Sequence, residues 1–221
     1  MMSVDQAVRQ RRSVRGFLPD EVPPATLEEI FSLAQQAPSN CNTQPWVVHV
    51  ASGQACENLR QRLLKAGVDP AQHRPDFPYD GRYQGIYQVR QFDAAAQLYG
   101  ALGIAREDKV ARGRAMLANY SFFGAPHVAF IGLPEPFGLR EAADCGIYAQ
   151  TLMLALTARG LASCPQAAVS FPAPAVREAL GLDARLRILM GISFGYEDTL
   201  APANRCRVGR AAVHDAVTFH R

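Results

Sequence analysis

The sequence has few cysteines and no arrangement of them that builds a site. The five cysteines form no Cys-x-x-Cys pair; they are Cys41, Cys56, Cys145, Cys164 and Cys206. This spacing argues against a structural zinc site and against a disulfide framework. Unpaired thiols are typical of a reducing compartment, so the sequence predicts a cytoplasmic protein.

Long apolar runs are also missing. No segment approaches the ~18 consecutive apolar residues that suggest a membrane span. Residues 1–6 lack the apolar core of a signal peptide. The five histidines are scattered without the spacing of metal ligands. The sequence therefore predicts neither a membrane span nor a metal site.

Two nucleotide-binding signatures are absent as well. The chain contains neither the G-x-G-x-x-G turn of a dinucleotide fold nor a G-x-x-x-x-G-K-[ST] phosphate loop. Neither sign of charge dominates, because 23 Lys and Arg against 20 Asp and Glu give a net charge of +3. A bias this small does not by itself indicate a nucleic-acid partner. With 221 residues, 48% of them hydrophobic, the chain is expected to form one domain over 1–221.

The most informative segment that is present runs from Pro38 to Trp46 and ends at the only tryptophan. Amide and hydroxyl side chains crowd this loop: Ser39, Asn40, Asn42, Thr43 and Gln44. Such a loop offers many short hydrogen-bonding arms to a polar heterocycle or to a partner chain. An ordinary turn is the alternative interpretation, because Ser, Asn and Pro are common in turns.

Basic residues gather near both ends of the chain. If 11–17 is a strand, Arg11, Ser13 and Arg15 share one face. That set suits a phosphate monoester, because Arg binds phosphate bidentately and Ser adds a neutral donor. A second basic group follows near the C-terminus: Arg205, Arg207 and Arg210. The two groups can meet in the fold and form one anion site; a solvated basic surface or a nucleic-acid surface is the alternative.

These segments, in order, resemble the nitroreductase family of FMN-dependent oxidoreductases. The matching motifs are Arg-x-Ser-x-Arg at 11–15, Pro-Ser-x-x-Asn-x-Gln-Pro-Trp at 38–46, and Gly-Tyr at 195–196 followed by the Arg-rich stretch. The resemblance spans Arg11 to Arg210. It implies an α+β sandwich with a central mixed, mainly antiparallel sheet flanked by helices. It also implies an interlaced homodimer with shared active sites.

The resemblance further implies a bound FMN, with NAD(P)H as a transient co-substrate. The residues expected to bind the cofactor come from both chain ends, the polar loop and the segment 165–168: Arg11, Arg12, Ser13, Arg15, Pro38, Ser39, Asn40, Asn42, Gln44, Pro165, Gln166, Ala167, Ala168, Arg207 and Arg210. Ser39, Asn42 and Gln44 are expected to reach the flavin from the second subunit. The backbone N–H of Ala167 is expected to donate to N5, the flavin atom that accepts hydride.

Two segments are candidates for the acceptor site. Relatives place an aromatic over the flavin near 120–124, so Phe123 is expected to cover a planar acceptor; core packing is an equal alternative for Phe122 and Phe123. Residues 68–91 form an irregular insertion, rich in Pro and Tyr, that is expected to act as a lid. Its Arg82 and Arg90 suit a carboxylated aromatic such as a nitrobenzoate.

Periodicity and capping residues predict the regular elements. Helices are expected from Ser3, after Pro24, around 59–67, over 92–102, 107–119 and 139–159, and from Pro174. Strands are expected over 11–17, 46–50, 127–131 and 186–194.

The leading functional interpretation is an FMN-dependent oxidoreductase that uses NAD(P)H to reduce nitroaromatic, nitrobenzoate-like or quinone acceptors by a ping-pong mechanism. Its partners are then a second copy of the chain and a small aromatic electron acceptor, without nucleic acid or membrane. Two alternatives stay open. One is a specialised flavin enzyme of the same fold that cleaves flavin or removes halide, and the other is a basic module that binds nucleic acid.

Overall fold

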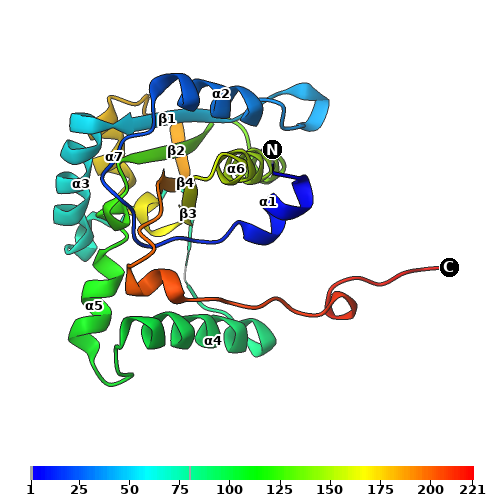
Figure 1. The fold of residues 1–221 in the computed structure, drawn as a ribbon. Coiled ribbons are helices and arrows are strands. Elements are labelled where there is room, and N and C mark those ends of the chain that lie inside the picture. Colours follow the sequence, from blue (N-terminus) through cyan, green and yellow to red (C-terminus); the bar gives the residue numbers. More distant parts are fainter. Residues whose placement is uncertain (1, 80) are drawn as a thin grey trace.

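The structure is a computed structural model that describes residues 2–79 and 81–221. Its helices are α1 Val4–Gln10, α2 Pro24–Ala34, α3 Gly53–Gly67, α4 Gly85–Leu102, α5 Lys109–Leu117, α6 Leu139–Ala158 and α7 Ala173–Leu180. Its strands are β1 Val47–Ser52, β2 His127–Pro134, β3 Ala162–Gln166 and β4 Leu186–Gly195. Helices on both sides of one sheet confirm the predicted α+β sandwich (Figure 1).

The strands form one sheet in the order β1-β2-β4-β3, and every neighbouring pair is antiparallel. Strand β2 lies inside the sheet and is buried along nearly its whole length, in keeping with its apolar sequence after His127. Within the described residues, the parallel component of the predicted mixed sheet is reduced to one isolated bridge, between Ser13 and Ser163.

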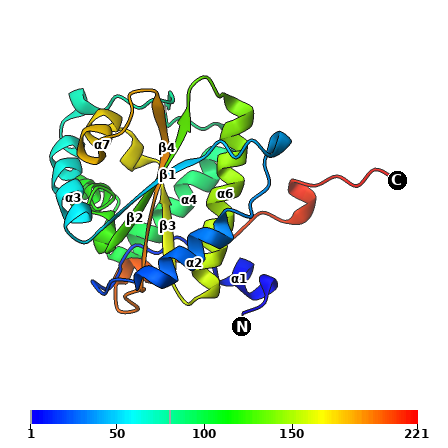
Figure 2. The same cartoon turned by 90° about the horizontal axis from the view of Figure 1, so that it is seen from above.

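Side chains that alternate along β2 supply two separate cores. Ala129 and Ile131 pack with α2 and α6 on one face of the sheet. Val128 and Phe130 pack with α3 and α7 on the other face. This division follows from the period of two in a strand. Figure 2 shows the sheet between α3 and α7 on one side and α2 and α6 on the other.

The predicted strand over 11–17 is wrong: this segment makes only isolated bridges, at Ser13 and Phe17. Its Val14 N–H does bond to Ser163 O on β3, at 3.0 Å. The Arg15 N–H points to the opposite edge of the segment and donates to Asn204 Oδ1 at 2.7 Å. On that edge the segment is therefore paired with a side chain from the C-terminal region. Strand β3 itself was missed, because Pro165 interrupts its sequence.

The expected lid over 68–91 is only partly irregular. Helix α4 begins at Gly85 rather than at residue 92. None of its residues is buried, so the periodic apolar signal that marks a helix on a core is missing. A short 3-10 turn occupies Pro70–Gln72. Residue 80 of this segment lies outside the described residues.

Helices α4 and α5 lie below the sandwich, and α4 packs against the short helix Pro202–Arg205 (Figure 1). The chain after Arg207 is exposed, and its last residues run away from the body. Among the described residues, no helix is both long and apolar enough to cross a membrane.

Candidate active site

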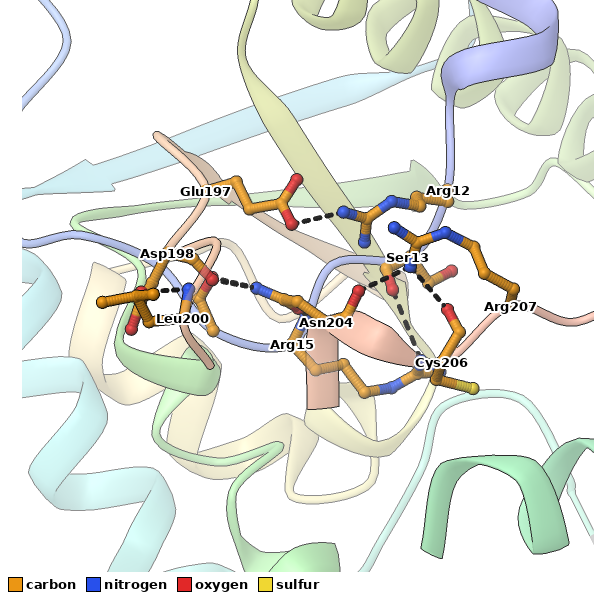
Figure 3. Close-up of polar contacts among 10 residues, drawn as sticks. Arg12, Ser13, Arg15, Glu197, Asp198, Leu200, Asn204, Cys206 and Arg207 are labelled. Atoms are coloured by element: carbon orange, nitrogen blue, oxygen red, sulfur yellow. Dashed lines mark hydrogen bonds and ion pairs between the residues drawn. The ribbon is translucent and has the colours of Figure 1, made fainter. Parts of the chain in front are cut away.

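Both ends of the chain meet at one cavity of about 900 Å³, here named the basic cavity. It is lined by the end of α1, the segment after it, Gln150 of α6, Glu197 and the start of the C-terminal tail: Val8, Arg9, Gln10, Arg11, Arg12, Ser13, Arg15, Gln150, Glu197, Cys206, Arg207, Val208, Gly209 and Arg210. Figure 3 shows Arg12, Ser13, Arg15 and Arg207 converging there. The structure thus brings together all six predicted site residues from the two ends.

The buried side chain of Asn204 ties the two ends to each other. Its Nδ2 donates to Gly16 O and to Asp198 O, both at 2.8 Å, and its Oδ1 accepts the Arg15 N–H at 2.7 Å. Gly16 is needed for this close approach, since a Cβ there would lie 2.4 Å from Cβ of Ala201. Sequence reasoning missed Asn204, whose only signal is its place just before the Arg-rich stretch.

The arginines of the basic cavity differ in how they are paired. Arg12 forms an ion pair with Glu197, so its charge is already balanced. Arg207 and Arg210 donate to nearby backbone carbonyls, for example Arg207 to Cys206 O at 2.9 Å and Arg210 to Gly209 O at 2.9 Å. Glu197 is the one carboxylate among the described lining residues.

Arg11 lies half-buried beside this excess of positive charge. Its pKa is lowered, mainly by burial and then by the charge of Arg210. The group stays protonated at neutral pH, because a guanidinium is effectively always charged in proteins. Two cations held together without a shared carboxylate form a site that an anion stabilises. A phosphate monoester fits that requirement.

The polar loop is held rigidly but does not line the basic cavity of its own chain. Trp46 is buried, donates Nε1–H to Gln35 Oε1 at 2.7 Å and lies 4.9 Å from Tyr148, ring centre to ring centre. The Asn40 N–H donates to the buried Asp144 at 3.1 Å. None of the predicted residues in 38–44 is among the described lining residues of the cavity.

Within that loop the backbone adopts a conformation that is rare for side chains other than glycine. Cys41, Asn42 and Gln44 have φ values of 49°, 56° and 48°. Ser39 Oγ accepts the Gln44 N–H at 2.9 Å and closes the loop. Strained backbone of this kind is typical of functional loops. Contact of the loop with a flavin in a second subunit stays a prediction.

The segment after β3 divides into a buried and an exposed part. Gln166 is buried, and its side chain donates to Asn119 O at 3.0 Å and accepts from Ser193 Oγ. That side chain is therefore turned into the protein, and contact of Gln166 with a cofactor stays a prediction. Ala167 is exposed, and its N–H donates no hydrogen bond to the described part of the chain. The expected donor at Ala167 is thus free, although its role stays a prediction.

The structure separates the two candidate phenylalanines. Phe122 is fully buried in the core, whereas Phe123 is partly exposed and lies 6.0 Å below the guanidinium of Arg15. Both have positive φ, at 57° and 54°. Arg60 brackets this strained turn by donating to Ser121 O at 3.1 Å and to Ala125 O at 2.8 Å. The sequence around Arg60 carries no signal of this role.

A second cavity of about 390 Å³, here named the apolar pocket, lies between α4, α5 and Phe123. Its lining is Arg15, Leu98, Leu102, Ile104, Ala111, Arg114, Ala115, Ala118, Asn119, Phe123 and Ala203. Arg15 lines both cavities and marks where they meet. Arg82 and Arg90 are not among the described lining residues of either cavity, so their expected contact with a carboxylated acceptor stays a prediction.

The buried cysteines do not supply a nucleophile. Burial raises the pKa of the Cys145 thiol and of the Cys164 thiol to about 11. Both groups are therefore protonated at neutral pH, and a thiol is a weak nucleophile. The described residues contain no cluster of three or more His, Cys, Asp or Glu side chains that could hold a metal ion.

Comparison with known proteins agrees with this geometry. Residues 8–196 match the model of the nitroreductase family. The chain is 47% identical to the nitroreductase NfnB of Mycolicibacterium smegmatis, over 99% of this chain and 93% of that protein. It is 35% identical to the 4-nitrobenzoate reductase of Pseudomonas putida, over 93% and 90%.

Solved structures show the same fold. The FMN-dependent nitroreductase NfnB from Mycobacterium smegmatis, in complex with NADPH, superposes with a TM-score of 0.94 at 47% identity, over 98% of this chain and 97% of that one. The FMN- and NADPH-dependent nitroreductase NfnB from Sphigopyxis sp. strain HMH has a TM-score of 0.96 at 34% identity, over the full length of both chains. The chain belongs to the nitroreductase family.

Proposed function

We propose that the protein is an FMN-dependent oxidoreductase that uses NADPH to reduce nitroaromatic and quinone acceptors. One observation carries the proposal: arginines from both ends of the chain line one cavity in which Glu197 is the one described carboxylate. The family and the FMN- and NADPH-dependent relatives support it.

The residues present fit FMN in charge and in size. Arg11, Ser13, Arg207 and Arg210 would hold its phosphate, because together they offer charged and neutral donors around one cavity. A volume of about 900 Å³ lies within the range of small-molecule sites. When bound, FMN supplies the two-electron transfer between nicotinamide and acceptor.

Other groups of the chain would orient the ring. The charge of Arg15, held where the two cavities meet, favours electron density on the part of the ring beside it. The free N–H of Ala167 offers a hydrogen bond from the end of β3. NADPH and the acceptor would visit the same face in turn, because the chain has no dinucleotide motif for a separate site. This sharing predicts ping-pong kinetics.

The purified protein tests the proposal directly. We expect a yellow protein that NADPH bleaches and that a nitroarene or a benzoquinone recolours. Arg207→Gln/Arg210→Gln should lose FMN on desalting, while Lys109→Gln, which removes a charge remote from the basic cavity, should retain it. A colourless protein that fails to take up added FMN would refute the proposal. Colourless protein with steeply salt-dependent DNA binding would instead favour the basic-module alternative.

The same proposal includes a homodimer in which each copy completes the other's site. The polar loop is held by hydrogen bonds, yet none of its described residues lines the basic cavity of its own chain. Large apolar side chains are exposed on α1, α4 and the C-terminal tail, for example Val4, Phe92 and Phe219. Exposed large apolar side chains on several elements are what a contact surface between chains would cover.

A further inference from the structure

The apolar pocket has one charged side chain, that of Arg114, for which the described part of the chain offers no polar partner. Arg114 lies on α5, is exposed and lines the pocket. Among the described residues it has neither an ion pair nor a hydrogen bond from its side chain. Its neighbour Arg112 differs, because it stacks on Tyr99 at 5.3 Å and donates to Arg106 O at 3.0 Å.

The remaining walls of the pocket are apolar or already satisfied. Its wall on the α4–α5 side is formed by Leu98, Leu102, Ile104, Ala111, Ala115 and Ala118. Asn119 also lines it, but its side chain donates to Met116 O at 2.9 Å and accepts from Gln166 at 3.2 Å. No carboxylate is among the described lining residues. The pocket therefore presents apolar surface together with net positive charge.

Size and position suit a single-ring molecule. A volume of about 390 Å³ is near the lower end of small-molecule sites and is under half that of the basic cavity. Phe123, held by its strained turn, offers an aromatic surface on which a planar ring can stack. Arg15 places the pocket directly beside the cavity assigned to FMN.

We propose that the apolar pocket binds the ring of the electron acceptor and that Arg114 pairs with a carboxylate on that ring. The preferred acceptors are then nitrobenzoate-like arylcarboxylates. This assignment rests on the proposed function, and it gives to Arg114 the role that the sequence suggested for Arg82 or Arg90. A charge-assisted bond from a guanidinium to a carboxylate adds affinity and fixes the orientation of the ring.

The kinetic test compares 4-nitrobenzoate with 4-nitrotoluene, which carries a methyl group in place of the carboxylate. With NADPH as reductant, Arg114→Gln should lower kcat/KM for 4-nitrobenzoate by about 10- to 100-fold, the usual effect of one charge-assisted hydrogen bond. The value for 4-nitrotoluene should stay within about twofold. Arg114→Lys should retain part of the selectivity, and Lys109→Gln, a matched loss of charge on α5, all of it.

Binding supplies a second measurement that does not depend on turnover. In isothermal titration calorimetry, benzoate should bind wild type and Lys109→Gln, and should bind Arg114→Gln at least about tenfold more weakly. Equal kcat/KM ratios and equal benzoate affinities in wild type and Arg114→Gln would overturn the assignment. So would an Arg114→Gln defect confined to the KM for NADPH, which would make Arg114 a nucleotide contact.

Failure of the proposed function gives a different result from failure of the Arg114 assignment. A protein that holds no FMN and reduces neither nitroarene refutes the function. A yellow, active protein whose Arg114→Gln variant loses both nitroarenes equally keeps the function and refutes the role of Arg114.

Discussion

At the scale of single residues, buried polar side chains determine how the segments around the sheet are connected. His127 on β2 is the clearest case outside the site. Its Nε2 accepts the Val22 N–H at 2.9 Å, and its Nδ1 lies 2.6 Å from Ser52 Oγ. Since Nε2 accepts, the neutral ring carries its proton on Nδ1 and donates to Ser52. Protonation of Nε2 would break the bond to Val22.

This geometry predicts a loss of stability in mild acid. Burial lowers the pKa of His127 below its ordinary 6.5, against a smaller opposing effect of Glu21. The unfolded chain therefore takes up the proton at a higher pH than the folded chain, so the free energy of unfolding falls as pH drops below about 6.5. Urea unfolding between pH 7.5 and 5 measures this loss.

His127→Gln should be less stable than wild type at pH 7.5 and should lose less stability on acidification. His49→Gln, on the neighbouring strand β1, is the matched control and should follow the wild-type pH dependence. An unchanged slope in His127→Gln would contradict the role of this ring.

At the scale of elements, the sequence predicted the helices and strands whose apolar residues recur with a helical or strand period. The helix over 139–159 and the strands at 46–50, 127–131 and 186–194 are confirmed by α6, β1, β2 and β4. The first turns of α4 were not predicted because the helix has no buried face and so no periodic apolar pattern. Strand β3 was not predicted because its sequence contains a proline. Such elements form through tertiary context that a local pattern does not contain.

The candidate site also contains residues that the sequence predicted and residues that it did not. The motif residues near both ends do meet, which their residue types and the family resemblance indicated. Asn204 and Arg60 were not predicted, because each acts on backbone atoms of a distant segment. Arg114 was missed because nothing local distinguishes it from the other basic residues of α5.

The partly buried carboxylate of Asp76 bonds the segment before α4 to α7 and β4. Asp76 pairs with Arg177 of α7 at 2.5 Å and accepts the Ile188 N–H of β4 at 2.7 Å. Asp76→Ala should destabilise the protein by about 2–4 kcal/mol, because it leaves Arg177 and a backbone donor without their partner. Asp76→Asn keeps an acceptor for Ile188 and should cost less.

The exposed pair of Arg62 and Glu178, also 2.7 Å apart, is the control for this prediction. Arg62→Gln should change the free energy of unfolding by no more than about 1 kcal/mol. Chemical denaturation of the variants measures both effects. A cost for Asp76→Ala as small as that for Arg62→Gln would show that the insertion is not held by this contact.

At the scale of the whole molecule, the proposed dimer places the polar loop of one copy at the basic cavity of the other. Heterodimers test this arrangement. One chain carries Arg207→Gln/Arg210→Gln, and the other carries Asn42→Gly/Gln44→Gly. Glycine removes the side chains while it retains the positive φ of the loop.

Each variant alone should be inactive. The heterodimer, isolated with two affinity tags after co-expression, has one intact site and should regain roughly half of the wild-type activity, as two-fold symmetry requires. An inactive heterodimer, or a wild-type protein that light scattering shows to be monomeric, would contradict shared sites.

The joining of the two chain ends by Asn204 has a consequence for the order of events in the cell. The N-terminal arginines leave the ribosome early, but the basic cavity is incomplete until the chain has been made as far as residue 210. If these arginines hold the flavin as proposed, a nascent chain retains it only after residue 210 has been made.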